Sequence, residues 1–145
     1  MNIYKPFPAI YNNPYKTTLL LFFMHYILLD TDFLLQCVRW KIDPFTELER
    51  LFVDSNIQIC VFDRTLQELQ GKKDSSLALA FTKKMHLLTT ENNQPVDDLL
   101  LHYGKEPNTV VATQDKALKE KLKKAGIPII TIRKQRYLVT DTHVL

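Results

Sequence analysis

Short β-rich runs alternate with helical patterns along most of this chain, from Tyr26 onward. The runs read HYILL, IQICVF, HLLT, TVVAT and PIITI, and the segments between them place apolar residues at helical spacing. Alternation of this kind is typical of α/β folds, in which helices cover a largely parallel sheet. The sequence therefore predicts an α/β domain with a mainly parallel sheet of five strands.

Helix start and stop signals fit the same interpretation. Asp43 and Pro44 begin one predicted helix, and Asp63 is predicted to cap another that Gly71 ends. Gly126 is predicted to end the last helix, before the fifth strand.

The length of the chain, 145 residues with 46% hydrophobic and 24% charged, fits one compact domain. Residues 1–18 are rich in aromatic residues and proline without periodicity, so we expect an irregular N-terminal arm over residues 1–24 and the folded domain over residues 25–145. We hypothesise that Met24 is the natural start; N-terminal sequencing of the native protein that began at Met1 would refute this.

Several classes of protein are excluded by missing motifs. The most apolar run, Leu19–Leu29, is about half the ~20 residues that a membrane span needs. Cys37 and Cys60 have no CxxC or zinc spacing, so we interpret them as reduced, buried thiols in a cytoplasmic protein. A glycine-rich phosphate loop, a zinc motif and a nucleophile elbow are also missing, which argues against nucleotide-binding proteins, zinc enzymes and triad hydrolases.

Acidic residues follow four of the predicted strands. They are Asp30 and Asp32 after the first strand, Glu68 in the helix after the second, Asp97 and Asp98 at the start of the helix after the third, and Asp115 after the fourth. Because ligands of open parallel sheets bind beyond the carboxyl ends of the strands, we expect these acids to gather at one edge. Taken singly, Asp32, Asp97, Asp98 and Asp115 are better explained as helix caps than as metal ligands, and the alternative for Glu68 is simple solvent exposure. Together they favour a metal site.

Crowded carboxylates repel one another unless a cation neutralises them. Hard oxygen ligands select Mg²⁺ or Mn²⁺, and Mg²⁺ completes its shell with water and substrate phosphates. Such an ion lowers the pKa of a bound water and so supplies a nucleophile for phosphodiester hydrolysis. A phosphodiester substrate is therefore expected.

Basic residues are concentrated near the C-terminus. Eight of the 19 Lys and Arg residues lie between Lys116 and Arg136, with Glu120 as the single acid in that stretch. This distribution suits a polyanionic partner, although a solvated helix face remains an equal alternative.

Four acid motifs in order, ILLDTDFLL, TLQEL, VDDLLL and VVATQD, resemble those of the PIN-domain ribonucleases over about residues 26–139. The resemblance implies a three-layer sandwich, whose central parallel sheet of about five strands has the order 3-2-1-4-5 and is flanked by helices. It also implies cleavage of RNA that depends on a divalent metal, Mg²⁺ or Mn²⁺, and leaves 5′-phosphate ends.

The same resemblance implies roles for individual residues. The metal-binding and catalytic acids would be Asp30, Glu68, Asp115 and one of the neighbours Asp97 and Asp98. Adjacent helix residues point about 100° apart, and Leu100 on the apolar face favours Asp97.

Supporting positions are implied in the same way. Thr31 and Thr113 match hydroxyl positions that often accompany the acids, and Asp32 stands where the family usually has Asn. We leave open whether Asp32 is a further metal ligand or a helix cap.

The C-terminal stretch, with its basic helix, GIPI strand and final Arg-Tyr, resembles the archaeal-type PIN nucleases that process rRNA of the small ribosomal subunit. This similarity implies an rRNA precursor as substrate and ribosome-assembly factors as partners. The candidate phosphate contacts are Lys116, Lys119, Lys123, Lys124, Arg133, Lys134 and Arg136. The alternatives are a toxin ribonuclease held by an antitoxin and a non-catalytic RNA-binding scaffold of an assembly complex, and a homodimer is left open.

Overall fold

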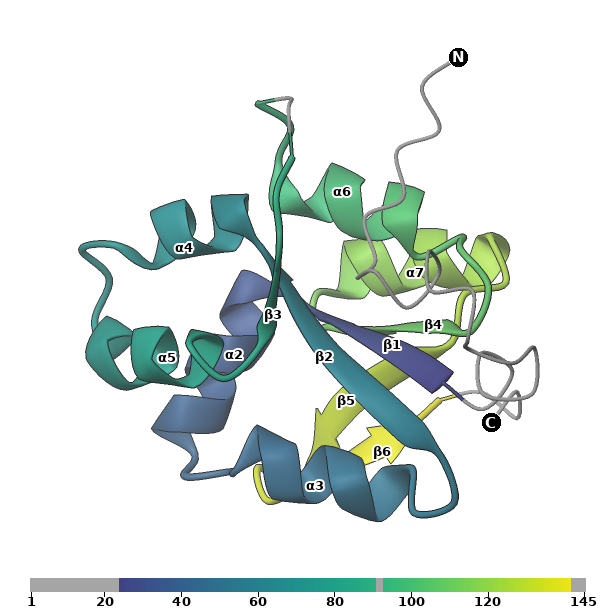
Figure 1. The fold of residues 1–145 in the computed structure, drawn as a ribbon, viewed down its shortest axis with the longest axis horizontal. Helices are drawn as coiled ribbons and strands as arrows, with labels where there is room; N and C mark the ends of the chain where they lie inside the picture. The colour runs from purple at the N-terminus through teal and green to yellow at the C-terminus, as the bar shows by residue number, and fades with distance from the viewer. Residues whose placement is uncertain (1–23, 91–92, 142–145) are drawn as a thin grey trace, which may run out of the picture.

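The computed structural model describes residues 24–90 and 93–141, and the secondary structure follows the expected alternation (Figure 1). The strands are β1 (Met24–Leu29), β2 (Asn56–Phe62), β3 (His86–Leu88), β4 (Thr109–Ala112), β5 (Ile129–Arg133) and β6 (Tyr137–Thr140). The helices are α2 (Thr31–Arg39), α3 (Pro44–Leu51), α4 (Asp63–Leu69), α5 (Ser75–Thr82), α6 (Val96–Tyr103) and α7 (Lys116–Lys124). Apart from Met24, which begins β1, the predicted N-terminal arm lies outside the described residues.

All the strands of the described ranges belong to one sheet with the order β3-β2-β1-β4-β5-β6. β1 lies between β2 and β4 and is parallel to both, and β3 and β5 continue the parallel arrangement on either side. The predicted fold class and the order of the first five strands are therefore confirmed. The sixth strand, β6, was not predicted; it is antiparallel to β5.

Helices cover both faces of the sheet, and the alternating residues of β1 supply both cores. Ile27 and Leu29 pack on one side with the buried faces of α2 and α3 and with Ala78 of α5. Tyr26 and Leu28 pack on the other side with α6 and α7. Figure 1 shows these two helical layers on either side of the strands.

The ends of the helices follow the predicted signals in most places. Asp43 caps α3 by accepting a hydrogen bond from the backbone N–H of Phe45 at 2.9 Å. Gly71 follows α4 and Gly126 follows α7, both with positive φ, which glycine adopts without steric cost.

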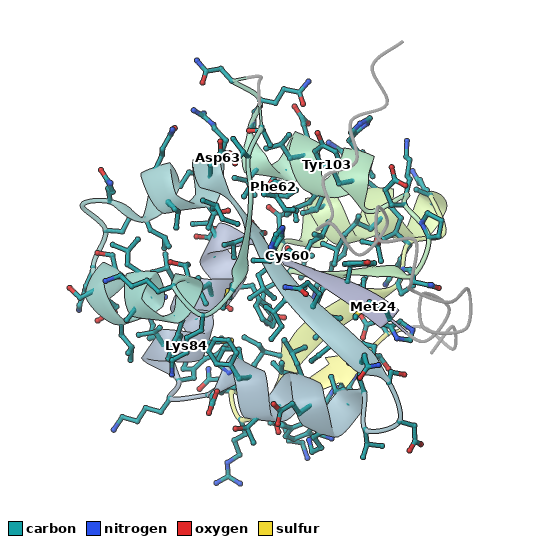
Figure 2. The ribbon with its side chains drawn as sticks, viewed as in Figure 1. Met24, Cys60, Phe62, Asp63, Lys84 and Tyr103 are labelled. Carbon is teal, nitrogen blue, oxygen red and sulfur yellow. The ribbon has the colours of Figure 1, made fainter. Side chains whose placement is uncertain are left out.

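The prediction that Asp63 caps α4 is wrong. Asp63 is the first residue of the helix, and its two carboxylate oxygens accept hydrogen bonds from the backbone N–H of Thr90 at 3.1 Å and from its hydroxyl at 2.8 Å. These two hydrogen bonds tie the start of α4 to the loop after β3. The ring of the preceding residue, Phe62, lies 5.5 Å from that of Tyr103 on α6 (Figure 2).

The strand β6 is held against α3 by side chains. Glu47 accepts a hydrogen bond from the N–H of Leu138 at 2.9 Å, and Arg50 donates to the carbonyl oxygen of Leu138 at 2.7 Å. Arg50 and Glu47 are also ion-paired at 2.9 Å.

None of the helices in the described ranges is both long and apolar enough to cross a membrane. Cys37 and Cys60 are free and buried, as the sequence predicts, and burial raises the pKa of each thiol to about 12.

Candidate active site

The carboxyl ends of the parallel strands carry the predicted acids. Asp30 follows β1 directly, and its N–H donates to the carbonyl oxygen of Ala112 at the end of β4 at 3.0 Å. Thr113 and Asp115 follow β4 within three residues, so the ends of the two central strands place Asp30 and Thr113 side by side.

Asp30 is the most buried of the candidate acids, with 6% of its surface exposed. The Thr113 hydroxyl donates a hydrogen bond to its Oδ2 at 2.8 Å. Burial raises the pKa of Asp30 to about 6, an effect that the Thr113 hydrogen bond opposes and that the charges of Asp97 and Asp32 reinforce. A nearby cation would therefore lower the free energy needed to ionise the Asp30 carboxyl group.

The Thr113 hydroxyl also orders the start of the next helix. It accepts a hydrogen bond from the N–H of Asp115 at 3.1 Å, and Asp115 Oδ1 accepts one from the N–H of Leu118 at 3.0 Å. Asp115 therefore acts as the N-cap of α7, as its position alone suggests, while it stays exposed at the same edge as Asp30.

Glu68 is positioned by Thr31, the second threonine of the site. Thr31 is the first residue of α2, and its hydroxyl donates to Glu68 Oε1 on α4 at 3.0 Å. Because Thr31 directly follows Asp30, this hydrogen bond holds Glu68 next to the end of β1.

Asp97 lies in the first turn of α6 and is coupled to the other acids. Its pKa is raised by burial and then by the charges of Asp115 and Asp98, and the positive charge of Lys121 lowers it. Because Asp97 also raises the pKa of Asp30, Asp97 is the member of the Asp97–Asp98 pair that is coupled to the acids after β1 and β4.

Asp32 does not cap α2, whose N-cap is Asp30. Its side chain is 71% exposed, and its Oδ1 lies 3.9 Å from the Nζ of Lys72. An exposed pair at this distance contributes little to stability.

The chemistry of these side chains fits a hydrated divalent ion. Within residues 24–90 and 93–141, no three Asp, Glu, His or Cys side chains are arranged to hold a metal ion directly. Mg²⁺ in proteins is commonly bound through one or two carboxylates with water in its remaining positions. The oxygen donors at this edge and the mutual repulsion of Asp30 and Asp97 fit such an ion.

The predicted phosphate contacts lie on α7 and around the turn between β5 and β6. All of them are exposed except Lys119, which is partly buried. Lys121 was not among the predicted phosphate contacts, although its positive charge lowers the pKa of Asp97. The lysine was visible in the sequence, but its side of α7 is identified only by the packing of α7 on α6.

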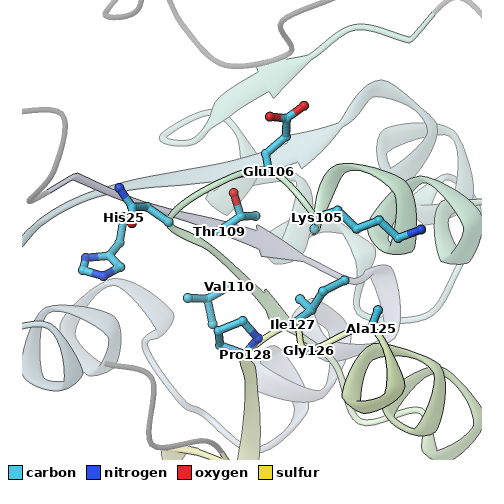
Figure 3. A pocket seen from close by; sticks show the side chains of 11 residues that line it. His25, Lys105, Glu106, Thr109, Val110, Ala125, Gly126, Ile127 and Pro128 are labelled. Atoms are coloured by element: carbon cyan, nitrogen blue, oxygen red, sulfur yellow. The ribbon is translucent and has the colours of Figure 1, made fainter.

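A cavity of about 260 Å³ lies at the other end of the strands, where the strands begin (Figure 3). Residues at the amino ends of three strands line it, among them His25, Thr109 and Pro128, and none of the candidate acids does. The acidic edge is therefore separate from this cavity.

Comparisons with known proteins identify the family to which this chain is similar. Residues 27–135, which lie within the domain predicted over residues 25–145, match a family described as "PIN like domain". The chain is 33% identical over 125 residues to "Ribonuclease VapC4" of Methanocaldococcus jannaschii, and the match covers 79% of this chain and 95% of that protein. The solved structure titled "Structure of the PIN domain endonuclease Utp24" matches with a TM-score of 0.71 and 27% identity, over 80% of this chain and 90% of the other.

Proposed function

Because this chain belongs to the family of PIN-like domains, we propose that it is a divalent-metal-dependent endoribonuclease. The observation that carries the proposal is the buried Asp30, whose ionisation is opposed by burial and by Asp97 at the carboxyl edge of the sheet. A buried carboxyl group with a raised pKa next to other acids is costly for a purely structural purpose.

We place the ion among four acids, one or two of which would bind it directly and the others through its water ligands. The four are Asp30, Glu68, Asp97 and Asp115, with Asp98 as the neighbour that adds negative charge. A bound Mg²⁺ or Mn²⁺ activates water and offsets charge that develops on the phosphate oxygens. Because the family resemblance implies 5′-phosphate ends, water adds to phosphorus and the bond that breaks is the one between phosphorus and the 3′ oxygen.

The remaining residues of the site orient the acids. The Thr113 hydroxyl fixes the Asp30 carboxylate, and the Thr31 hydroxyl fixes Glu68. Hydrogen bonds to the residues that bind a metal restrict their rotation and keep them ready to bind it. The basic residues of α7 and of the β5–β6 turn would hold the RNA backbone without reading its sequence.

The experiment compares cleavage of a single-stranded RNA by the wild type and by Asp30→Asn, with Mg²⁺, with Mn²⁺ and with a chelator. We expect cleavage by the wild type with metal only, and a loss of at least a hundredfold in Asp30→Asn, as outer-shell changes alone cost 10–100-fold. Asp54→Asn is the matched control, because Asp54 is an exposed aspartate in the turn before β2. Equal cleavage by the wild type and Asp30→Asn would refute the site.

For the biological role we propose maturation of the RNA of the small ribosomal subunit in the cytoplasm. The basic α7 and the resemblance of the C-terminal stretch to rRNA-processing PIN nucleases support this role, and the 27% identical solved structure is that of a PIN domain endonuclease. Cleavage of a precursor rRNA fragment at one position, but not of unrelated RNAs of equal length, is the expected result.

A second candidate is a toxin ribonuclease controlled by an antitoxin. The 33% identical protein is named a ribonuclease, and the match covers 95% of it. This supports a small ribonuclease as the second candidate. Growth arrest upon expression of the wild type but not of Asp30→Asn, without a defect in rRNA maturation, would favour this candidate over the first.

A further inference from the structure

Arg64 is a basic residue at the acidic edge that was not among the predicted site residues. It lies in the first turn of α4, directly after Asp63 and four residues before Glu68. Residues four apart lie on the same face of a helix, so Arg64 and Glu68 are neighbours on α4. Asp63 accepts two hydrogen bonds from Thr90 on the loop after β3, so the residue before Arg64 is anchored to that loop.

The contacts of the Arg64 guanidinium group are with neutral side chains. Its Nη1 donates to Gln67 Oε1 at 2.8 Å and to Asn93 Oδ1 at 3.0 Å. Its Nε is buried without a hydrogen-bond partner. Among residues 24–90 and 93–141, no carboxylate forms a salt bridge with Arg64, whereas Arg50 has Glu47 at 2.9 Å.

Since none of the Arg64 contacts among the described residues is with a carboxylate, the guanidinium group can form charge-assisted hydrogen bonds with an anionic ligand. The guanidinium group of arginine is planar, and its parallel N–H groups match two phosphate oxygens. Because Gln67 and Asn93 already hold Nη1, the side chain is fixed before any ligand arrives. These features suit an anion that approaches the acidic edge.

The order of the strands places Arg64 relative to the other basic residues. Arg64 follows β2, Asp30 follows the central strand β1, and Lys116 follows β4 on the far side. Neighbouring strands are about 4.8 Å apart. Positive charge therefore lies on both sides of Asp30 along the order of the strands.

Resting on the proposed function, we propose that Arg64 binds an RNA phosphate on the β2 side of Asp30. The RNA strand then crosses the edge of the sheet from α4, over Asp30, to the lysines of α7. Arg64 is a binding residue for the phosphate next to the scissile one, and it acts on RNA affinity through its charge.

The test measures binding of a short, labelled single-stranded RNA at several salt concentrations, in the full chain with Asp30→Asn to prevent cleavage. Each phosphate contact to a single strand contributes about 0.7 to the slope of log affinity against log salt. Adding Arg64→Gln is expected to lower the slope by about 0.7 and the affinity about fivefold at ~0.1 M salt. Arg64→Met, which keeps the aliphatic stem, is expected to behave alike and serves if the Gln variant does not fold.

Arg39→Gln is the matched control. Arg39 has an exposed side chain at the C-terminal end of α2, 3.9 Å from Asp74, and its loss should leave the slope unchanged. An unchanged slope in both Arg64 variants would overturn the inference, and so would an equal change in the control. If the wild type cleaves RNA while the Arg64 variants keep the salt slope of the Asp30→Asn parent, only the inference fails. If the parent chain does not bind RNA and the wild type does not cleave it, the proposed function fails with the inference.

Discussion

Replacing Asp30 with Asn is expected to stabilise the metal-free protein while it abolishes cleavage. Asp30 is 6% exposed, and burial is the largest cause that raises its pKa from the ordinary 3.8 to about 6. A difference of about two pKa units corresponds to roughly 3 kcal/mol, at 1.36 kcal/mol per unit. This is the cost of ionising Asp30 in the folded protein.

The pH dependence of this cost has a definite sign. Between pH 3.8 and about 6 the folded state binds the proton of Asp30 more tightly than the unfolded state does. The free energy of unfolding therefore falls as pH rises through this window. The full cost is present above the raised pKa and absent below the ordinary one. Asn has no ionisable group, and its amide oxygen can still accept the hydrogen bond from Thr113.

Urea denaturation in the presence of a chelator measures the effect. At about pH 8 we expect Asp30→Asn to be more stable than the wild type by up to roughly 3 kcal/mol; the gap should narrow as pH falls below about 6 and close near pH 4. Asp54→Asn, an exposed aspartate, should follow the wild type at every pH. A constant gap over the whole pH range would refute the reasoning. Added Mn²⁺ should stabilise the wild type more than Asp30→Asn, because the ion binds the folded state through this carboxylate.

Three further predictions concern hydrogen bonds and packing. Thr113→Val removes the hydrogen bond that lowers the pKa of Asp30, so the acid limb of the pH–rate profile should move to higher pH; an unmoved limb would contradict the assignment. Thr31→Val frees Glu68 and should weaken Mn²⁺ binding by about 10–100-fold in calorimetric titration, with Thr46→Val on α3 unaffected. A Cβ at Gly104 would lie 2.6 Å from a backbone oxygen, so Gly104→Ala should lose about 1–3 kcal/mol of stability in urea, and wild-type stability would show that the backbone relaxes there.

Local patterns in the sequence predicted the five parallel strands because each strand is apolar and lies between helix signals. The sixth strand, YLVT, is short, and the turn between β5 and β6 lacks the residues that usually mark a tight turn. Lys134 and Gln135 adopt φ of 55° and 54°, a conformation for which Gly, Asn or Asp is the usual sign. The hairpin forms because β5 offers a partner, which a local pattern does not show.

The position of the candidate acids after the strands was also predictable, but their partners were not. Thr113 and Asp30 are 83 residues apart, and their hydrogen bond depends on β1 and β4 being neighbours. The contact between Asp63 and Thr90 likewise crosses 27 residues, so the sequence signal of a cap at Asp63 was misleading. Such contacts follow from the order of the strands and not from the residues around each acid.

The two hydrogen bonds at Leu138 affect how this protein behaves at high concentration. An edge strand normally exposes N–H and C=O groups that can recruit a strand from another molecule. Glu47 and Arg50 occupy both groups of Leu138, in the middle of β6. The opposite edge strand, β3, is only three residues long. The sheet is thus poorly suited to grow by adding strands from other molecules, which protects the chain against aggregation through its edges.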